Sequence, residues 1–134
     1  MRQNVCAIIV TWNSGGEIAR ILPGVSEQAG TVIVVDNGST QENIRILREI
    51  MTPFGNVIML ENPENMGIAH ALNRGVRYAM EHGYEWVLTL DDNGKPGQGM
   101  VQEMFSAFNK LSAQEREKVA IIAPNYRTLK GPVY

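Results

Sequence analysis

The stretch "TVIVVDNGSTQENIRILREIM", Thr31–Met51, contains the pattern that decides the fold. It opens with a continuous run of β-branched residues, which is typical of a strand buried on both faces, as in a parallel sheet. The tetrad "DNGS" then supplies turn-forming residues. Ser39 with Glu42 three residues later predicts a capped helix start. The residues that follow place their apolar side chains on one helical face, at Ile44, Leu47 and Ile50.

The same strand pattern occurs five times along the chain. The predicted strands are Val5–Thr11, Thr31–Asp36, Asn56–Glu61, Glu85–Asp91 and Val119–Pro124. Most are rich in β-branched residues and do not alternate cleanly between apolar and polar, as expected for strands buried on both faces.

Segments with helical periodicity separate these strands. They are Ser14–Leu22, which Pro23 and Gly24 should break or kink, then Ser39–Met51, Asn65–Gly83 and Gln98–Leu111. Strands that alternate with helices predict right-handed crossovers. We therefore expect an α/β fold, a Rossmann-like open and mostly parallel sheet with helices on both faces, formed by a single domain spanning residues 1–134.

Composition narrows the function classes. The chain has 134 residues, 44% of them hydrophobic and 19% charged, and its net charge is −2. The basic residues are scattered, so no nucleic-acid partner is expected. The single cysteine, Cys6, lies in an apolar run and fits a small buried residue in a reducing compartment. No apolar run approaches the roughly 20 residues that span a bilayer, so we expect a cytoplasmic protein, at most peripheral to the inner face of the cytoplasmic membrane.

Ligands of open parallel sheets bind at the carboxyl ends of the strands, so the four strand exits are the places to look. The first exit, "TWNSGG", lacks both the dinucleotide fingerprint and the P-loop. Thr11 and Asn13 could offer polar groups to a base or ribose beside Trp12. A plain turn with a helix cap is the alternative.

The second and third exits carry further polar residues. Asp36 and Asn37 follow the second strand, where an acid can hydrogen-bond a ribose or a base edge, although a turn starter has the same composition. Asn65 and Gly67 precede the longest helix, whose polar face holds His70, Asn73, Arg74 and Arg77. A glycine there permits close approach of a ligand. A solvated helix face is the alternative for the side chains of that face.

The fourth exit, "DDNGKPG", places Asp91, Asp92 and Asn93 after a buried strand. Carboxylate and amide oxygens suit Mg²⁺ or Mn²⁺, which bind through one or two carboxylates together with phosphate oxygens and waters. Such a metal would reduce the repulsion between the two acids and would bridge a diphosphate that no glycine loop of this chain can hold. A simple turn is the alternative, because "DNG" and "PG" are strong turn signals.

Together these exits resemble a known family. The stretches "AIIVTWNSG", "VIVVDNGST", "ENPENMGIAHALNRGVRYAMEHG" and "WVLTLDDNGKP" are similar to the nucleotide-sugar-binding half of family 2 glycosyltransferases of the GT-A fold, in the rhamnosyltransferase-like branch. The resemblance implies a metal-dependent, inverting transfer of a sugar from dTDP-rhamnose or a UDP-sugar. The acceptor would be a saccharide or a lipid-linked molecule, in bacterial surface polysaccharide synthesis.

The resemblance also implies roles by position. Thr11, Asn13 and Asp36 would hold the nucleoside. Asn65, Gly67 and Asn73 would line the diphosphate and the sugar. Asp91–Asn93 would form the D-x-D-type metal motif, in which Asn93 stands where the last acid often is, so Asp92 is the first choice of metal ligand.

In this family an acidic general base lies in an acceptor-binding half that follows the metal motif. We therefore expect the catalytic base to lie beyond Tyr134 and the chain to be truncated, with an exposed sheet edge that favours a homodimer. Two other functions fit an alternating α/β chain: a non-catalytic nucleotide-binding or receiver-like regulatory module, and a sugar-phosphate nucleotidyltransferase. A receiver needs an acidic pair after the first strand and an acceptor Asp after the third, whereas these strands end in "TWN" and "ENP". The exit "TWNSGG" lacks the basic loop of a nucleotidyltransferase.

Overall fold

The structure, a computed structural model, describes residues 2–125, 127–128 and 131–132. The chain forms two compact units, Met1–Gln98 and Gly99–Tyr134. The elements of the first unit are η1 (Arg2–Asn4), β1 (Val5–Thr11), η2 (Glu17–Arg20), α1 (Leu22–Gln28), β2 (Thr31–Asn37), α2 (Gln41–Met51), β3 (Val57–Asn62), α3 (Ile68–Glu81) and β4 (Trp86–Asp91).

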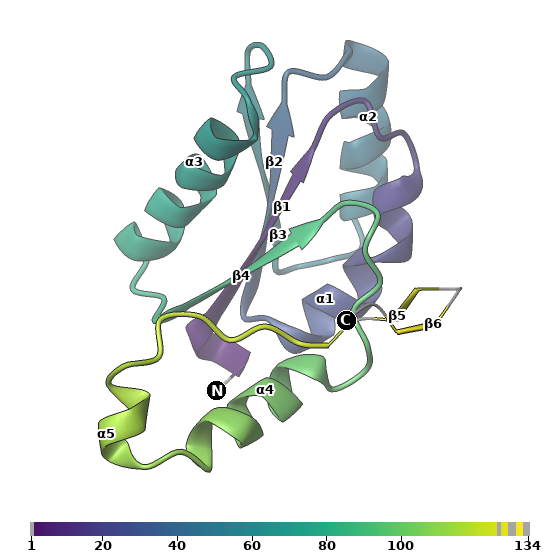
Figure 1. Cartoon of the computed structure of the whole chain (residues 1–134). Coiled ribbons are helices and arrows are strands. Elements are labelled where there is room, and N and C mark those ends of the chain that lie inside the picture. The colour runs from purple at the N-terminus through teal and green to yellow at the C-terminus, as the bar shows by residue number, and fades with distance from the viewer. Residues whose placement is uncertain (1, 126, 129–130, 133–134) are drawn as a thin grey trace. The chain divides into compact units, whose positions relative to one another are not determined.

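The strands of the first unit form one parallel sheet in the order β3-β2-β1-β4, drawn in Figure 1. The first strand of the chain therefore lies inside the sheet, between β2 and β4. The parallel α/β architecture predicted from the sequence is confirmed. All four carboxyl ends point toward the same end of this unit, as the arrowheads in Figure 1 show.

Helices cover both faces of this sheet: α3 lies on one, and η2, α1 and α2 lie on the other (Figure 1). Under α3, the buried residues Cys6, Ile8, Ile33, Val35, Ala71 and Ala79 form a core cluster. Gly75 allows α3 to approach β1 closely, because a Cβ there would lie 2.6 Å from Cγ2 of Ile8. This packing fixes the position of the α3 amino end beside the strand exits.

Burial differs between the interior and edge strands. Nearly every residue of β1 and β2 is buried, whereas β3 and β4 expose several of their side chains. The expectation that all strands are buried on both faces is therefore wrong for β3 and β4. An edge strand has a neighbour on one side only, so its side chains are less completely covered.

Two helix starts differ from the sequence prediction. Residues 14–22 do not form one helix, because η2 ends at Arg20 and α1 begins at Leu22. Pro23 does not break a helix but lies in the first turn of α1, where its missing N–H has no intrahelical partner to lose. The cap of α2 is Thr40 rather than Ser39, since the Thr40 side chain accepts from the Asn43 N–H.

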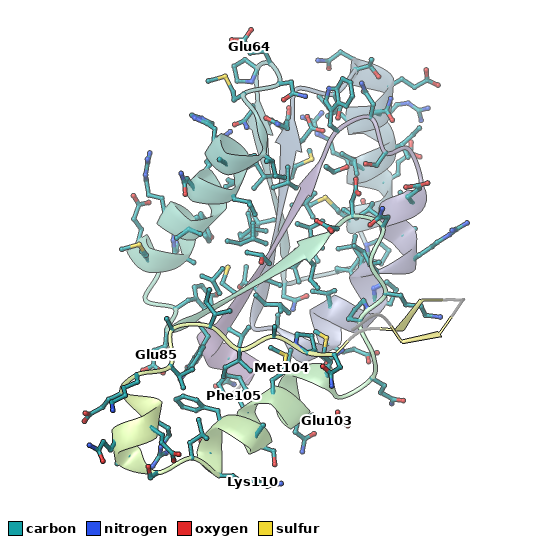
Figure 2. All side chains as sticks on the ribbon, in the orientation of Figure 1. Glu64, Glu85, Glu103, Met104, Phe105 and Lys110 are labelled. Atoms are coloured by element: carbon teal, nitrogen blue, oxygen red, sulfur yellow. The ribbon has the colours of Figure 1, made fainter. Side chains whose placement is uncertain are left out.

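The second unit contains α4 (Met100–Asn109), α5 (Ala113–Arg116) and the antiparallel pair β5 (Arg127–Thr128) and β6 (Gly131–Pro132). The helix predicted at Gln98–Leu111 is confirmed. Figure 2 labels four of its side chains, of which Met104 and Phe105 are half-buried, whereas Glu103 and Lys110 are exposed.

The strand predicted at Val119–Pro124 is wrong, because that segment has no regular secondary structure. Its β-branched residues would fit a sheet, but a strand also needs a neighbour to complete its hydrogen bonds. The Val119 N–H donates instead to the carbonyl of Arg116 in a turn after α5. Across the residues that the structure describes, no helix has the length and apolar character needed to cross a bilayer.

Candidate functional site

The predicted site residues gather at the carboxyl end of the sheet. Register pairs Thr11 with Asp36 and Val10 with Asp91, so three strand exits lie side by side. In Figure 2, Glu64 marks this end of the first unit, and Glu85, which immediately precedes β4, marks the opposite end. Three of the four exits at which the sequence analysis looks for a ligand site are therefore neighbours in the structure.

The hydroxyl of Ser14 connects the first and fourth exits. The Thr11 side chain donates to Ser14 Oγ at 2.6 Å, and Ser14 Oγ donates to Oδ2 of Asp92. The sequence predicts only that a helix begins at Ser14, and it does not predict the link from Ser14 to Asp92. Only the polar composition of "TWNSGG" hints at this role, because the two residues are 78 positions apart.

The loop after β1 is also tied to the start of α2. Asn13 has a left-handed backbone with φ of 49°, its N–H donates to Ser39 Oγ at 2.8 Å, and its side-chain oxygen accepts from the Thr40 N–H at 2.9 Å. These hydrogen bonds hold the loop after β1 against the start of α2, so Asn13 has a structural role in addition to its predicted nucleoside contact. Trp12 beside it is 55% exposed, which leaves its indole ring accessible for stacking.

Asp36 combines complete burial with an unused acceptor. Its residue is 0% exposed, and Oδ2 accepts from the Ser39 N–H at 3.0 Å. Among the described residues, Oδ1 has no hydrogen-bond partner. A buried polar atom without a partner is costly, so Oδ1 fits an N–H or O–H donor that a ligand would supply. Such a donor reaches Oδ1 only if neighbouring side chains move.

The amides at the second and third exits pair with one another. Asn37 donates to Asn65 Oδ1 at 3.0 Å, and its own oxygen accepts from Asn62 at 3.0 Å and from the Met66 N–H at 3.1 Å. Asn65 Oδ1 also accepts from the Gly67 N–H at 3.0 Å. This network holds the loop before α3. The ligand roles expected for Asn37, Asn65 and Gly67 therefore stay predictions beside an observed structural role.

Asp91, Asp92 and Asn93 form the turn after β4, closed by the Gly94 N–H donating to the Asp91 carbonyl at 3.1 Å. The Asp91 side chain is exposed, and its carboxylate accepts no hydrogen bond from the residues described. Asp92 is half-buried and bonded to Ser14. The turn and metal interpretations are compatible, because a turn can expose side-chain oxygens.

The oxygen donors at this turn fit Mg²⁺ or Mn²⁺. The described residues contain no group of three or more His, Cys, Asp or Glu side chains arranged to hold a metal ion. Two carboxylates and an amide alone would leave coordination positions open, and these cations commonly fill them with phosphate oxygens and waters. The site therefore suits a cation that arrives with a diphosphate.

Asn73 lies in a different environment. It lines a groove of about 440 Å³ along α3 and the end of β3, together with Glu61, Asn62, Pro63, His70, Arg74 and Arg77. Within the described part of the chain, no hydrogen bond links Asn73 to the other predicted site residues. Its expected contact with the donor sugar stays a prediction.

A solved structure resembles this arrangement. The mannosyltransferase PcManGT from Pyrobaculum calidifontis, in complex with GDP-Man and Mn²⁺, matches with a TM-score of 0.62 and 29% sequence identity. The match covers 72% of this chain and 29% of that chain. It supports the Rossmann-like, GT-A-type α/β fold expected from the sequence.

Two curated proteins are also similar. The dTDP-rhamnosyl transferase RfbF of Shigella flexneri is 30% identical over 96 residues, which are 71% of this chain and 31% of that protein. The uncharacterized protein MJ0544 of Methanocaldococcus jannaschii is 28% identical over 87 residues, 63% of this chain and 38% of that protein. The chain thus spans about a third of the length of these relatives.

The sequence model of one family, glycosyl transferase family 2, matches residues 6–115. That range includes the strand exits described above, from Thr11 to Asn93, and most of the chain. The match agrees with the parallel sheet and with the two glycosyltransferases to which the chain is similar. The chain therefore belongs to glycosyl transferase family 2.

Proposed function

We propose that the carboxyl end of this sheet binds a nucleoside-diphosphate sugar, dTDP-rhamnose or a UDP-sugar, together with Mg²⁺ or Mn²⁺. One observation carries the proposal: the Ser14 hydroxyl bonds to both Thr11 and Asp92, which joins the predicted nucleoside side to the predicted metal side. Asp36 is the register partner of Thr11, so its unpaired oxygen belongs to the same cluster.

The nucleoside binds at the exits of β1 and β2. Oδ1 of Asp36 accepts an N–H of the base or an O–H of the ribose, and the desolvation cost of that buried oxygen is offset once the donor is in place. Trp12, with its exposed ring, supplies an aromatic surface for the base. A pyrimidine nucleotide agrees with the named dTDP-rhamnosyl transferase relative, whereas the solved mannosyltransferase contains GDP-Man.

The diphosphate binds at the exit of β4. Asp92, with Asp91 and Asn93, holds the divalent cation, and this cation supplies charge neutralisation for the diphosphate leaving group. The Mn²⁺ in the mannosyltransferase complex supports this assignment. Because Ser14 donates to Oδ2 of Asp92 in the structure, cation binding through that oxygen competes with the hydrogen bond to Ser14.

In the whole protein, this donor site serves an inverting transfer of a hexose to a saccharide or lipid-linked acceptor in bacterial surface polysaccharide synthesis. The protein works at the cytoplasmic side, peripheral to the membrane. The named rhamnosyl- and mannosyltransferase relatives support hexose transfer. No observation favours the receiver-like alternative. Family 2 membership supports a transferase, and the exits of β1 and β3 lack the acidic pair and the acceptor Asp of a receiver.

Calorimetric titration of dTDP, UDP and GDP, each with and without Mn²⁺, tests the proposal. We expect Mn²⁺ to raise the affinity for one pyrimidine nucleotide at least about tenfold, which corresponds to about 1.4 kcal/mol. Asp92→Ala should abolish that enhancement. Glu85→Ala is the matched control, because Glu85 is an exposed acid that immediately precedes β4, whereas Asp92 follows the other end of that strand.

Two results would contradict the proposal. One is nucleotide binding that is independent of both Mn²⁺ and Asp92. The other is an equal loss of affinity in Asp92→Ala and Glu85→Ala, which would indicate a general charge effect rather than a cation site.

A further inference from the structure

Among the residues that line the groove along α3 and the end of β3, only Asn73 is also predicted to contact the donor, and the two arginines of the groove have no role in the proposed donor site. The groove has a volume of about 440 Å³, and its lining combines polar and charged side chains of α3 with the last residues of β3. On α3, residues 70, 73, 74 and 77 follow the i, i+3, i+4, i+7 spacing that places them along one helix face. The buried face of α3 carries Ala71, Gly75 and Ala79 instead.

The groove is positively charged. Arg74 and Arg77 contribute two guanidinium groups, and Glu61 is the only acid in the lining. The Glu61 carboxylate already pairs with Arg48 of α2. Its negative charge is therefore largely compensated from outside the lining, and the two arginines remain uncompensated there.

Arg74 is held in place before any ligand binds. Its Nη1 donates to the Glu61 carbonyl and to Asn62 Oδ1, the latter at 2.6 Å. Its remaining N–H groups form no hydrogen bond with the described residues. A guanidinium fixed on one side loses less conformational entropy when the other side binds an anion.

Arg77 lies one turn along from Asn73 and is exposed. Within residues 2–125, its guanidinium has neither an ion pair nor a hydrogen bond. His70 and Asn73 are exposed on the same face and add further N–H donors. The lining thus offers several N–H donors and little negative charge, which is the composition of an anion site.

We propose that this groove binds a phosphoryl group, without a metal ion and separately from the nucleotide. Two guanidinium groups match the double negative charge of a phosphate monoester, and the planar donor fork of arginine suits phosphate oxygens. A carboxylate would neutralise only one of them. The groove also leaves room for part of the molecule that carries the phosphate, either a small metabolite or a lipid headgroup.

Backbone NMR titration with inorganic phosphate and with glycerol 3-phosphate tests the proposal, in EDTA and at constant ionic strength set with chloride. We expect shifts for groove residues of α3 and for Asn62. Arg77→Ala should weaken binding about tenfold. Arg45→Ala is the matched control, because Arg45 is an exposed arginine on α2 outside the groove and its loss changes the net charge equally.

A second arm identifies the source of the phosphate. Sedimentation with phosphatidylcholine vesicles, with and without phosphatidic acid, should show binding only to the acidic vesicles if the ligand is a headgroup, and Arg77→Ala should reduce it more than Arg45→Ala. Binding to free phosphate alone indicates a metabolite. Either result supports the proposal that the groove binds a phosphoryl group.

The proposal is overturned if neither phosphate source binds, if Arg77→Ala and Arg45→Ala weaken binding equally, or if sodium acetate shifts the same residues with equal affinity. Asp92→Ala separates this proposal from the donor site. The groove should bind phosphate normally in that variant even if the metal-dependent nucleotide site is lost or never existed.

Discussion

The two ends of the parallel sheet use their polar side chains differently. At the amino end, Asn56 donates to the carbonyls of Ser26 and Ala29 at 2.9 and 3.2 Å, and the Thr31 and Tyr84 hydroxyls hydrogen-bond each other. At the carboxyl end, Asp36 keeps one buried oxygen without a partner among the described residues. The described polar groups at the amino end are therefore paired, whereas at the carboxyl end one of the two oxygens of a buried acid is left without a partner.

The difference indicates which end of the sheet can bind a ligand. Polar groups that are fully paired stabilise the fold and have little left to offer a ligand. At the carboxyl end the amides, such as Asn37, are paired and shape the loops, whereas the acids of the β2 and β4 exits retain free acceptors. The distinction can be tested by comparing changes at the two ends.

The largest effect is expected for Gly38→Ala, at the carboxyl end. Gly38 has φ of 82°, and a Cβ there would lie 2.3 Å from the Glu64 backbone carbon. The left-handed backbone and the clash should together cost about 3 kcal/mol of unfolding free energy, measured by urea denaturation.

Gly55→Ala is the control at the amino end of β3. A Cβ on Gly55 would meet no atom within 4 Å, and its φ is not positive, so we expect no loss of stability. Equal destabilisation by the two substitutions would show that the close approach of the β2 and β3 exits is not what requires glycine.

The next effect concerns Cys6, near the amino end of β1. Burial raises the pKa of the Cys6 thiol from 9.0 to about 11, so at neutral pH its thiolate is about 100-fold rarer than in the unfolded chain. We expect labelling by a thiol reagent to be slower by at least that factor in the folded protein than in urea.

The same shift sets a pH dependence of stability. Because the pKa of Cys6 is higher in the folded protein, burial of the neutral thiol contributes to the unfolding free energy. This contribution is fully present below pH 9 and is lost as the pH rises toward 11. Cys6→Ala should remove this part of the loss of stability at alkaline pH. Rapid labelling of the folded protein at pH 7 would contradict the burial of Cys6.

A pair of substitutions compares the two ends directly. Asn56→Ala should cost about 2 kcal/mol, because the carbonyls that it bonds would lose their donor, and it should leave nucleotide affinity unchanged. Asp36→Asn should change stability by less than about 1 kcal/mol, since an amide oxygen still accepts from the Ser39 N–H. It should weaken nucleotide binding about tenfold, because an amide N–H replaces an acceptor.

Denaturation and calorimetry on both variants measure these effects. The contrast between the two ends fails if Asn56→Ala weakens nucleotide binding as much as Asp36→Asn does, or if Asp36→Asn unfolds the protein.

Most of the fold could be predicted from the sequence because its signals are local. Runs such as Val32–Val35 and the 3.6-residue period of α2 and α3 need no knowledge of distant residues. Val119–Pro124 has the same composition without the strand, since pairing partners are not encoded in the segment itself. Pro23 was misread for a similar reason, because its effect depends on whether it falls inside a helix or in its first turn.

The candidate site was predictable in outline but not in its connections. The rule that ligands bind at strand ends led to the exits that carry Thr11, Asp36 and Asp92, whose ligand roles stay predictions. The Ser14 bridge to Asp92 spans 78 positions and depends on strand order, which no local pattern specifies. Arg74 and Arg77 could be seen as a polar face, but the groove that they line exists only once the last residues of β3 lie beside α3.

The smallest effect is expected for Tyr84→Phe, at the amino end. The Tyr84 hydroxyl bonds to Thr31 Oγ1 across 53 positions, and its loss should cost about 1 kcal/mol of unfolding free energy. Since this pair lies at the opposite end of the sheet from Asp36, nucleotide affinity should not change. When Thr31→Val is combined with Tyr84→Phe, it should cause little further loss of unfolding free energy, because the two side chains share one hydrogen bond. Strictly additive losses in this double-mutant cycle would show that the pair is not coupled, and reduced nucleotide affinity in Tyr84→Phe would remove the functional distinction between the two ends.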